Sequence, residues 1–440
     1  MKNKKAFTLV ELLAVIVILA IILVIAVPQV LDTITSTKQG SIDVSVKNIA
    51  KAAEMKYAEM IVTGENISGV INCSEVVNIS NTDYSNCNVT FDNDGKAMVS
   101  LIGIGKFEGY VCTTGTKENS NCVNINEEKR LINYINYLYV TDALNNGLLM
   151  DDTADKNIRY SGSNSEVKNY VKFNNELWRI IGIVDGKVKL VKNESIGDYS
   201  WDSSPSDKNS GNGYNIWETK EGKTKADGTT KADINILLNE GYYEGTYPST
   251  CYGGQNNTIK DCPTATINST LKSMVDENAV WYLGGQTYSN PSSQPYGLPT
   301  LDSYNNERGT KVYSGHTLIA KTKWIGKVGL IYPSDYGYAS TDSECRVNLR
   351  AGLVDKSGTY DYTNVQCKNN NWLYKNAWYW TLSSNAGNSH NVFYMHANGP
   401  VSDYYAYSVG AVLPSVYLKS NILIENGDGS SSNPYILKAS

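Results

Sequence analysis

Length and charge bound what this chain can be. Its 440 residues are enough for two or three domains. A net charge of −5, with 19% charged residues, gives no basic surface for nucleic acid, so we set nucleic-acid binding aside as a main function. The 32 tyrosines far outnumber the 5 phenylalanines. This excess suits exposed binding surfaces, although an A/T-rich genome would produce the same bias.

The first thirty residues carry the most specific signal. Three lysines precede a stretch that is purely apolar from Leu12 to Val27, with Glu11 at its entrance. An ordinary secretory signal would show an A-x-A-like cleavage site after this stretch, and none follows Val27. A charged side chain costs about 2.5–3.5 kcal/mol to insert into lipid. Glu11 therefore needs a partner, which a plain membrane-anchored surface protein does not supply.

The order Ala6-Phe7-Thr8-Leu9-Val10-Glu11 before the apolar stretch resembles the amino terminus of type IV pilins and pseudopilins. The resemblance implies that a prepilin peptidase cuts between Ala6 and Phe7 and that the new amine is methylated. It also implies that Glu11 sets the filament register by lying near the amine of a neighbouring subunit. Ala6 departs from the family pattern, which overwhelmingly has Gly at this position.

This resemblance also implies partners and a location. The partners are the prepilin peptidase, other pilin subunits through the N-terminal helix, and the inner or cytoplasmic membrane. The protein is expected to cross the cell membrane once before assembly and then to lie on the surface or tip of an extracellular filament, the pilus.

The expected fold class is α+β, with a long pilin helix on a small antiparallel sheet followed by a larger β-rich domain. After Pro28 the apolar residues recur at the spacing of one helix face, with Pro28 marking a kink at the membrane end, Gly40 a second weak point and Gly64 the stop. The residues of this face are Leu31, Ile34, Ile42, Val46, Ile49, Ala53, Tyr57 and Met60. The run 92–95, Asp-Asn-Asp-Gly, predicts a hairpin turn rather than a calcium loop. The expected segments are a leader at 1–6, the helix at 7–64, a small β head at 65–126, a helical connector at 127–156 and the β-rich domain at 157–440.

Eight cysteines form a set of even number, which in an exported chain favours disulfides. Neighbours along the sequence enclose short loops, so we expect local pairing, although the sequence does not prove the connectivity. A zinc site is the alternative, but no C-x-x-C occurs. The expected pairs are Cys73–Cys87, Cys112–Cys122, Cys251–Cys262 and Cys345–Cys367.

Three stretches of the second half carry another resemblance: 177–181 with 200–202, 327–338, and 378–383 leading to 412–418. Together they resemble bacterial surface domains whose closing segment is similar to the C-type-lectin-like fold of formylglycine-generating-enzyme relatives. Leu413 departs from that pattern, where many relatives have Arg. The cysteines do not match the oxidase site of those enzymes, so no oxidase activity is implied.

The resemblance implies that ligand contacts lie between the Trp-rich strand and the final strand. This segment displays small polar residues, Tyr and His between apolar anchors, as an adaptable recognition surface requires. A solvated loop without a ligand is the alternative. The candidate ligand-binding residues are Asn385, Asn388, His390, Tyr394, His396, Asn398, Asp403, Tyr404, Tyr405 and Tyr407.

Two functions are consistent with these features. The first is a minor pilin that displays an adhesin-like head for an unknown cell-surface protein or glycan. The second is a structural pseudopilin, or the initiating subunit of a type II-secretion-like or DNA-uptake filament. Three histidines without a nucleophile motif beside them argue against an enzyme, and we expect no cofactor and no metal.

The cleavage motif generates a first prediction. We expect a prepilin peptidase to remove residues 1–6, and mass spectrometry of the protein isolated from its native membrane should show a chain that begins at Phe7. Because Gly is the usual residue before the cut, Ala6→Gly should raise the cleaved fraction. A chain that still begins at Met1 where the peptidase is active would contradict the prediction.

Glu11 generates a second prediction. Glu11→Ala should leave membrane insertion intact or improve it, because the substitution removes a charge from the lipid boundary. It should reduce incorporation into filaments, measured beside wild-type subunits, whereas the control Val10→Ala should not. Equal incorporation of the Glu11→Ala subunit would show that this carboxylate does not set the register.

Overall fold

The structure is a computed structural model that describes residues 9–64, 70–78, 83–92, 94–120, 122–125, 130–143, 145–173, 175–203, 214–254, 258–288, 297–350 and 365–440. The side chains of residues 9–33, 35, 114, 142, 365 and 366 lie outside the described part. The chain divides into two compact units, unit 1 (Met1–Glu128) and unit 2 (Lys129–Ser440). The α+β class predicted from the sequence is confirmed, since both units combine helices with sheets.

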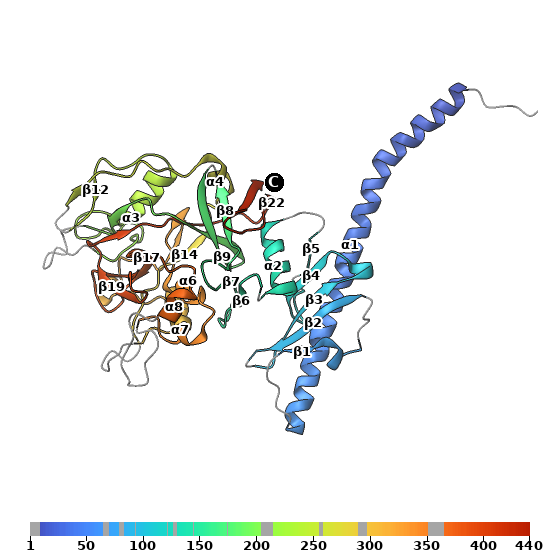
Figure 1. The fold of residues 1–440 in the computed structure, drawn as a ribbon, viewed down its shortest axis with the longest axis horizontal. Coiled ribbons are helices and arrows are strands. Elements are labelled where there is room, and N and C mark those ends of the chain that lie inside the picture. The colour runs from blue at the N-terminus through green and yellow to red at the C-terminus, as the bar shows by residue number, and fades with distance from the viewer. Residues whose placement is uncertain are drawn as a thin grey trace, which may run out of the picture. The chain divides into compact units, whose positions relative to one another are not determined.

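Unit 1 is built on one long helix, α1 (Leu9–Thr63), which continues without a break through Pro28 and Gly40. It ends where the sequence predicts, because Gly64 directly follows it with φ 78°, a left-handed conformation that glycine adopts without strain. The strands of unit 1 lie across the C-terminal half of α1 (Figure 1).

A five-stranded antiparallel sheet completes unit 1, in the order β1-β2-β3-β4-β5. The predicted turn joins β2 to β3, where the Asp92 carboxylate accepts the backbone N–H groups of Asp94 and Lys96 at 3.0 and 2.9 Å. Buried and half-buried side chains alternate along β3, as expected for a sheet with one face on a core. The strands are β1 (Ile71–Asn72), β2 (Tyr84–Phe91), β3 (Ala97–Gly103), β4 (Tyr110–Gly115) and β5 (Cys122–Asn124).

The core of unit 1 lies between this sheet and one face of α1. Ile42 and Val46 are fully buried there, together with Val99 and Leu101 of β3. Each such side chain contributes about 1.5–3 kcal/mol by leaving water. Ile34, which the periodicity placed on the same face, is 46% exposed and does not belong to this core.

Unit 2 contains a nine-stranded mixed sheet that runs β16-β21-β10-β9-β8-β23-β22, with β6 and β7 joined to it through β9. Within it, β8 and β23 are parallel. The strands are β6 (Leu148–Met150), β7 (Ile158–Tyr160), β8 (Tyr170–Phe173), β9 (Glu176–Val184), β10 (Lys187–Lys192), β16 (Val328–Gly329), β21 (Ser415–Tyr417), β22 (Ile422–Asn426) and β23 (Tyr435–Ala439).

A second sheet of unit 2 has five strands in the order β11-β20-β17-β18-β19. These strands are β11 (Asp198–Ser200), β17 (Tyr379–Ser384), β18 (Asn391–Met395), β19 (Val401–Tyr405) and β20 (Val409–Ala411). Two short pairs are β12 (Cys251–Tyr252) with β13 (Ile259–Lys260), and β14 (Val280–Tyr282) with β15 (Lys323–Ile325).

The helices of unit 2 are short apart from α2, which lies beside residues of the large sheet. Leu131 and Ile135 of α2 join the core of unit 2, and β6 pairs with β7, so most of the expected connector at 127–156 is part of unit 2. The helices are α2 (Leu131–Asp142), α3 (Asp233–Ile236) continued by a π-helix (Leu237–Tyr243), α4 (Ser269–Met274), α5 (Thr300–Arg308), α6 (Pro333–Tyr338), α7 (Ser343–Val347) and α8 (Val365–Asn369). Short 3₁₀ turns are Cys73–Glu75, Gly105–Phe107 and Ser314–His316.

Buried tryptophans organise the core of unit 2. The indole N–H of Trp201 donates to the Thr381 carbonyl at 3.1 Å, and that of Trp372 donates to the Tyr160 carbonyl at 2.8 Å. Both indoles lie between segments far apart in sequence, and each satisfies its polar atom, as buried tryptophans usually do. All eight cysteines are paired, in the four local pairs that the sequence favoured: Cys73–Cys87, Cys112–Cys122, Cys251–Cys262 and Cys345–Cys367.

Candidate binding surface

The predicted ligand segment forms β18, β19 and the turns around them. Tyr404 of β19 lies opposite Val392 of β18, and Tyr394 lies opposite Ser402, so Tyr394 and Tyr404 share one face of the sheet. Tyr404 is 43% exposed, whereas Tyr394 is only 6% exposed. The two rings therefore differ in role although they are neighbours.

Trp378, directly before β17, explains this difference. Its indole stacks on the Tyr394 ring, with centroids 5.0 Å apart and planes at 29°, and it remains 41% exposed. Tyr404 stands almost perpendicular to it, at 85° and 6.3 Å, and the His396 ring lies 4.7 Å away. Trp378 thus covers Tyr394 and forms an aromatic corner with Tyr404.

A stack of rings continues from this corner. Tyr404 and Tyr405 have centroids 5.2 Å apart. Tyr405 then stacks on Tyr407 at 5.3 Å with planes at 9°, and on His390 at 5.3 Å with planes at 29°. We call the whole set the aromatic face; it consists of Trp378, His390, Tyr394, His396, Tyr404, Tyr405 and Tyr407.

Asp403 supports the aromatic face from within. One of its carboxylate oxygens accepts the side-chain amides of Asn385 and Asn391, each at 2.8 Å, and the Tyr288 hydroxyl donates to the other oxygen. Burial, together with the Asp403 charge, raises the pKa of Tyr288, so this hydroxyl keeps its proton and remains a donor. Asp403 and Asn385 therefore hold the strands together, and their polar groups are engaged by the protein itself.

A second support, Asn215, was not singled out in the sequence. Its side-chain amide donates to three backbone carbonyls, those of Asn385 and Asn388 before β18 and that of Asn391, the first residue of β18, at 2.8, 2.6 and 3.0 Å. The Asn388 side chain accepts the His390 backbone N–H at 2.9 Å. One asparagine from a distant segment thus fixes the turn that carries His390.

The remaining predicted residues lie in the turn between β18 and β19. The His396 ring nitrogen Nδ1 accepts the Asn398 backbone N–H at 3.0 Å, in the tautomer assigned here, and Asn398 is exposed. Partial burial and the charge of Lys368 lower the pKa of His396, which favours the neutral ring at neutral pH. The ten predicted residues are thus brought together, and their ligand contacts stay a prediction. Besides Asn215, the sequence analysis missed Trp378, whose signal was an aromatic residue just before a strand whose own aromatics are buried.

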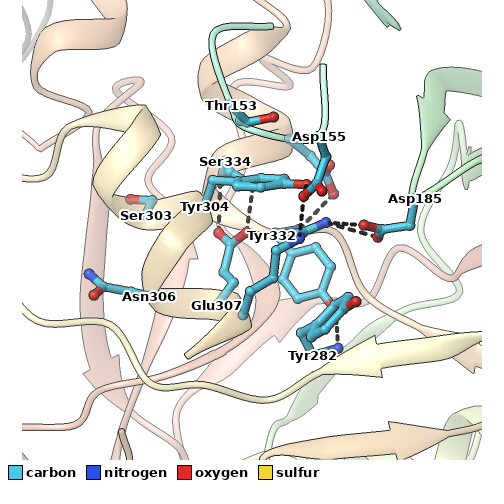
Figure 2. Close-up of polar contacts among 12 residues, drawn as sticks. Thr153, Asp155, Asp185, Tyr282, Ser303, Tyr304, Asn306, Glu307, Tyr332 and Ser334 are labelled. Carbon is cyan, nitrogen blue, oxygen red and sulfur yellow. Dashed lines mark hydrogen bonds and ion pairs between the residues drawn. The ribbon is translucent and has the colours of Figure 1, made fainter. Parts of the chain in front are cut away.

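A buried acid, Glu307, is connected through hydrogen bonds to the segment that carries the aromatic face. Glu307 of α5 is fully buried and accepts the Ser334 backbone N–H at 3.0 Å and the Ser334 hydroxyl at 2.5 Å (Figure 2). Burial raises the pKa of Glu307 to about 7, although the neighbouring Arg308 opposes this shift. A carboxyl group in such surroundings is often functional, yet here the donors around it come from the protein.

Gln286 connects Glu307 to the aromatic face. Its side-chain amide donates to Glu307 at 3.2 Å. Its backbone N–H donates to the Ser384 carbonyl at 2.8 Å, and its own carbonyl accepts the Ala386 N–H at 2.9 Å. Since Asn385 lies between these two residues, a chain of hydrogen bonds runs from the buried acid to Asp403. We call Glu307, Gln286, Asn385 and Asp403 the polar frame.

Arg308, the next residue of α5, pairs with a different acid. Its guanidinium donates to both oxygens of Asp185 at 2.8 Å and stacks over the Tyr304 ring at 3.4 Å. The Tyr304 hydroxyl in turn donates to Asp155 at 2.6 Å (Figure 2). Both bonds come from the one nitrogen Nη2, and this charge-assisted pair with its aromatic cover fixes the end of α5, and with it the position of Glu307. Among the described residues, no three His, Cys, Asp or Glu side chains gather as a metal site.

The raised pKa of Glu307 generates a prediction about pH. The folded state holds the proton up to its raised pKa of about 7, whereas the unfolded chain releases it near the ordinary glutamate pKa of 4.5. Stability should therefore fall as pH rises between these values, by at most about 3 kcal/mol. Glu307→Gln should remove this slope from the melting temperature between pH 5 and 8. The exposed control Glu425→Gln should keep it, and an unchanged slope in Glu307→Gln would contradict the assignment.

The comparisons with known proteins concern the amino terminus. Residues 1–27 match the family model of the prokaryotic N-terminal methylation motif. No curated protein and no solved structure matches the chain. Among the residues whose side chains the structure describes, which exclude 9–33, no helix is long and apolar enough to span a membrane. Ala6, Phe7 and the Glu11 side chain lie outside that part. The motif supports a type IV pilin-like or pseudopilin-type subunit that starts as a membrane-anchored precursor.

Proposed function

We propose that this chain is a minor type IV pilin-like subunit that displays unit 2 as an adhesin-like head. The methylation motif at residues 1–27 supports the pilin-like part. The long helix packed on a small antiparallel sheet in unit 1 agrees with it. In this proposal the precursor crosses the membrane once, and the mature subunit lies on the surface or tip of a filament.

The aromatic face is the observation that carries the binding role. Trp378 and Tyr404 are exposed by 41% and 43%, and both belong to one continuous cluster of rings. Solitary exposed aromatics are ordinary, but a contiguous group of them marks an interaction site. Tyrosine also brings a large contact area at a low cost in side-chain entropy. The polar frame holds this surface in one arrangement, which lowers the cost of binding further.

The likeness of residues 157–440 to C-type-lectin-like surface domains is part of the proposal. In that likeness the segment between the Trp-rich strand and the final strand carries the ligand contacts. Six of the seven residues of the aromatic face lie in this segment, between β17 and β20, and Trp378 directly precedes β17. This agreement of position supports the head as a binding unit rather than a spacer.

The second candidate is a structural pseudopilin or an initiating subunit of a secretion or DNA-uptake filament. The methylation motif fits this role equally well, since both kinds of subunit share the motif. In that case the aromatic face would be covered by another subunit. The two candidates therefore differ in whether Tyr404 and Tyr405 are accessible after assembly.

Accessibility in the assembled filament tests the proposal. Hydroxyl-radical labelling should modify Trp378, Tyr404 and Tyr405 to the same extent in filaments and in the free full-length chain. Tyr252, a partly exposed tyrosine of β12 outside the aromatic face, serves as the internal reference. Protection of Tyr404 and Tyr405 by tenfold or more in filaments, with Tyr252 unchanged, would favour the structural role instead.

A further inference from the structure

We infer that the ligand of the aromatic face is a neutral glycan, with one pyranose ring seated on Trp378 against Tyr404. The inference rests on the proposed binding function and names the ligand class of the same surface. Three features of the face carry it: the shape of the corner, the lack of charge in its lining, and the free hydroxyls beside it.

The corner offers an open aromatic floor. Tyr394 packs under one face of the Trp378 indole, at 5.0 Å and 29°. The His396 ring also contacts the indole, at 4.7 Å, yet 41% of Trp378 remains exposed to solvent. The Tyr404 ring stands at 85° to the indole plane and bounds this surface on one side. A flat ring with C–H groups on one side fits this shape, since polarised C–H groups meet the negative face of an indole favourably.

The corner is also uncharged. The hollow between Trp378 and Tyr404 is lined by aromatic rings together with Ser408, Val409 and Gly410, and by no charged side chain. A charged group placed there would lose water without gaining a partner, which costs free energy. The nearby carboxylate of Asp403 is already bonded by three donors. The lining of the hollow therefore favours a neutral ring over a charged group, although the charges of Lys368 and Arg350 act on the neighbouring His396 and Tyr394.

The adjoining stack supplies polar contacts for further sugar units. The Tyr404, Tyr405 and Tyr407 hydroxyls make no hydrogen bond to another described residue, and each can donate and accept. The nearly parallel packing of Tyr405 on Tyr407 restrains both rings before a ligand arrives. Tyr405 stacks on both Tyr407 and His390, so the hydroxyls of this stack, and not its ring faces, are the groups that can contact further sugar units. The face thus suits an oligosaccharide better than a single sugar.

The test uses the full-length chain in detergent and a defined panel of probes. Cellohexaose, chitohexaose, maltohexaose and lacto-N-tetraose are the neutral glycans, whereas sialyllactose and heparin fragments are the charged ones. Calorimetric titration should detect at least one neutral glycan and no preference for the charged probes. Trp378→Ala should weaken this binding at least tenfold, and Tyr404→Ala with Tyr405→Ala should do the same. Tyr252→Ala, outside the face, should bind like the wild type.

A second substitution keeps the test decisive if Trp378→Ala lowers the melting temperature by uncovering Tyr394. Trp378→Phe retains a ring over Tyr394 but offers a smaller floor, so it should weaken binding severalfold at an unchanged melting temperature. Absence of binding to every neutral glycan would overturn the inference, as would binding that survives both Trp378 substitutions. Capture of a protein ligand that depends on Tyr404 and Tyr405 would overturn the glycan class and leave the proposed binding function standing. Protection of the aromatic face in filaments would instead contradict the proposed binding function.

Discussion

A carboxylate that leaves water must find donors within the protein, and this constraint organises unit 2. Asp335 of α6 is 2% exposed and binds Lys189 of β10 and Arg159 of β7, each at 2.6 Å. Loss of one partner from such a buried pair costs about 3–5 kcal/mol, because the other charge is left unpaired. The Asp403 carboxylate likewise needs a donor within the protein, and the Tyr288 hydroxyl supplies it. Each acid thus fixes segments more than one hundred residues apart.

This constraint extends from the core to the surface. Glu307 needs the Gln286 amide, and Gln286 positions the backbone on both sides of Asn385. Asn385 in turn donates to Asp403, next to the exposed Tyr404. A surface ring is mobile by itself, whereas one attached to a satisfied buried network is held in place. Rigidity of the aromatic face is therefore a property of the polar frame behind it.

The sequence predicted those parts of the fold that depend on local pattern. Helical spacing placed Ile42 and Val46 on the buried face of α1, and Gly64 at its end, because these follow from geometry within the helix. The same spacing failed for Ile34, since burial also needs a sheet to pack against. The short loops between neighbouring cysteines predicted how the cysteines pair. The role of α2 was missed, because its partners in unit 2 are distant in sequence.

In the candidate surface too, local pattern predicted some features, whereas contacts between distant segments decided others. The resemblance that singled out this segment pointed to Tyr404, which is exposed, and equally to Tyr394, which Trp378 covers. It also assigned ligand contacts to Asp403, whose oxygens are taken by protein donors. What separates these residues is the pleat of β19 and one indole that arrives from outside the segment. A polar residue in a sequence can serve a ligand or the scaffold, and only the count of donors around it in the folded chain decides between the two.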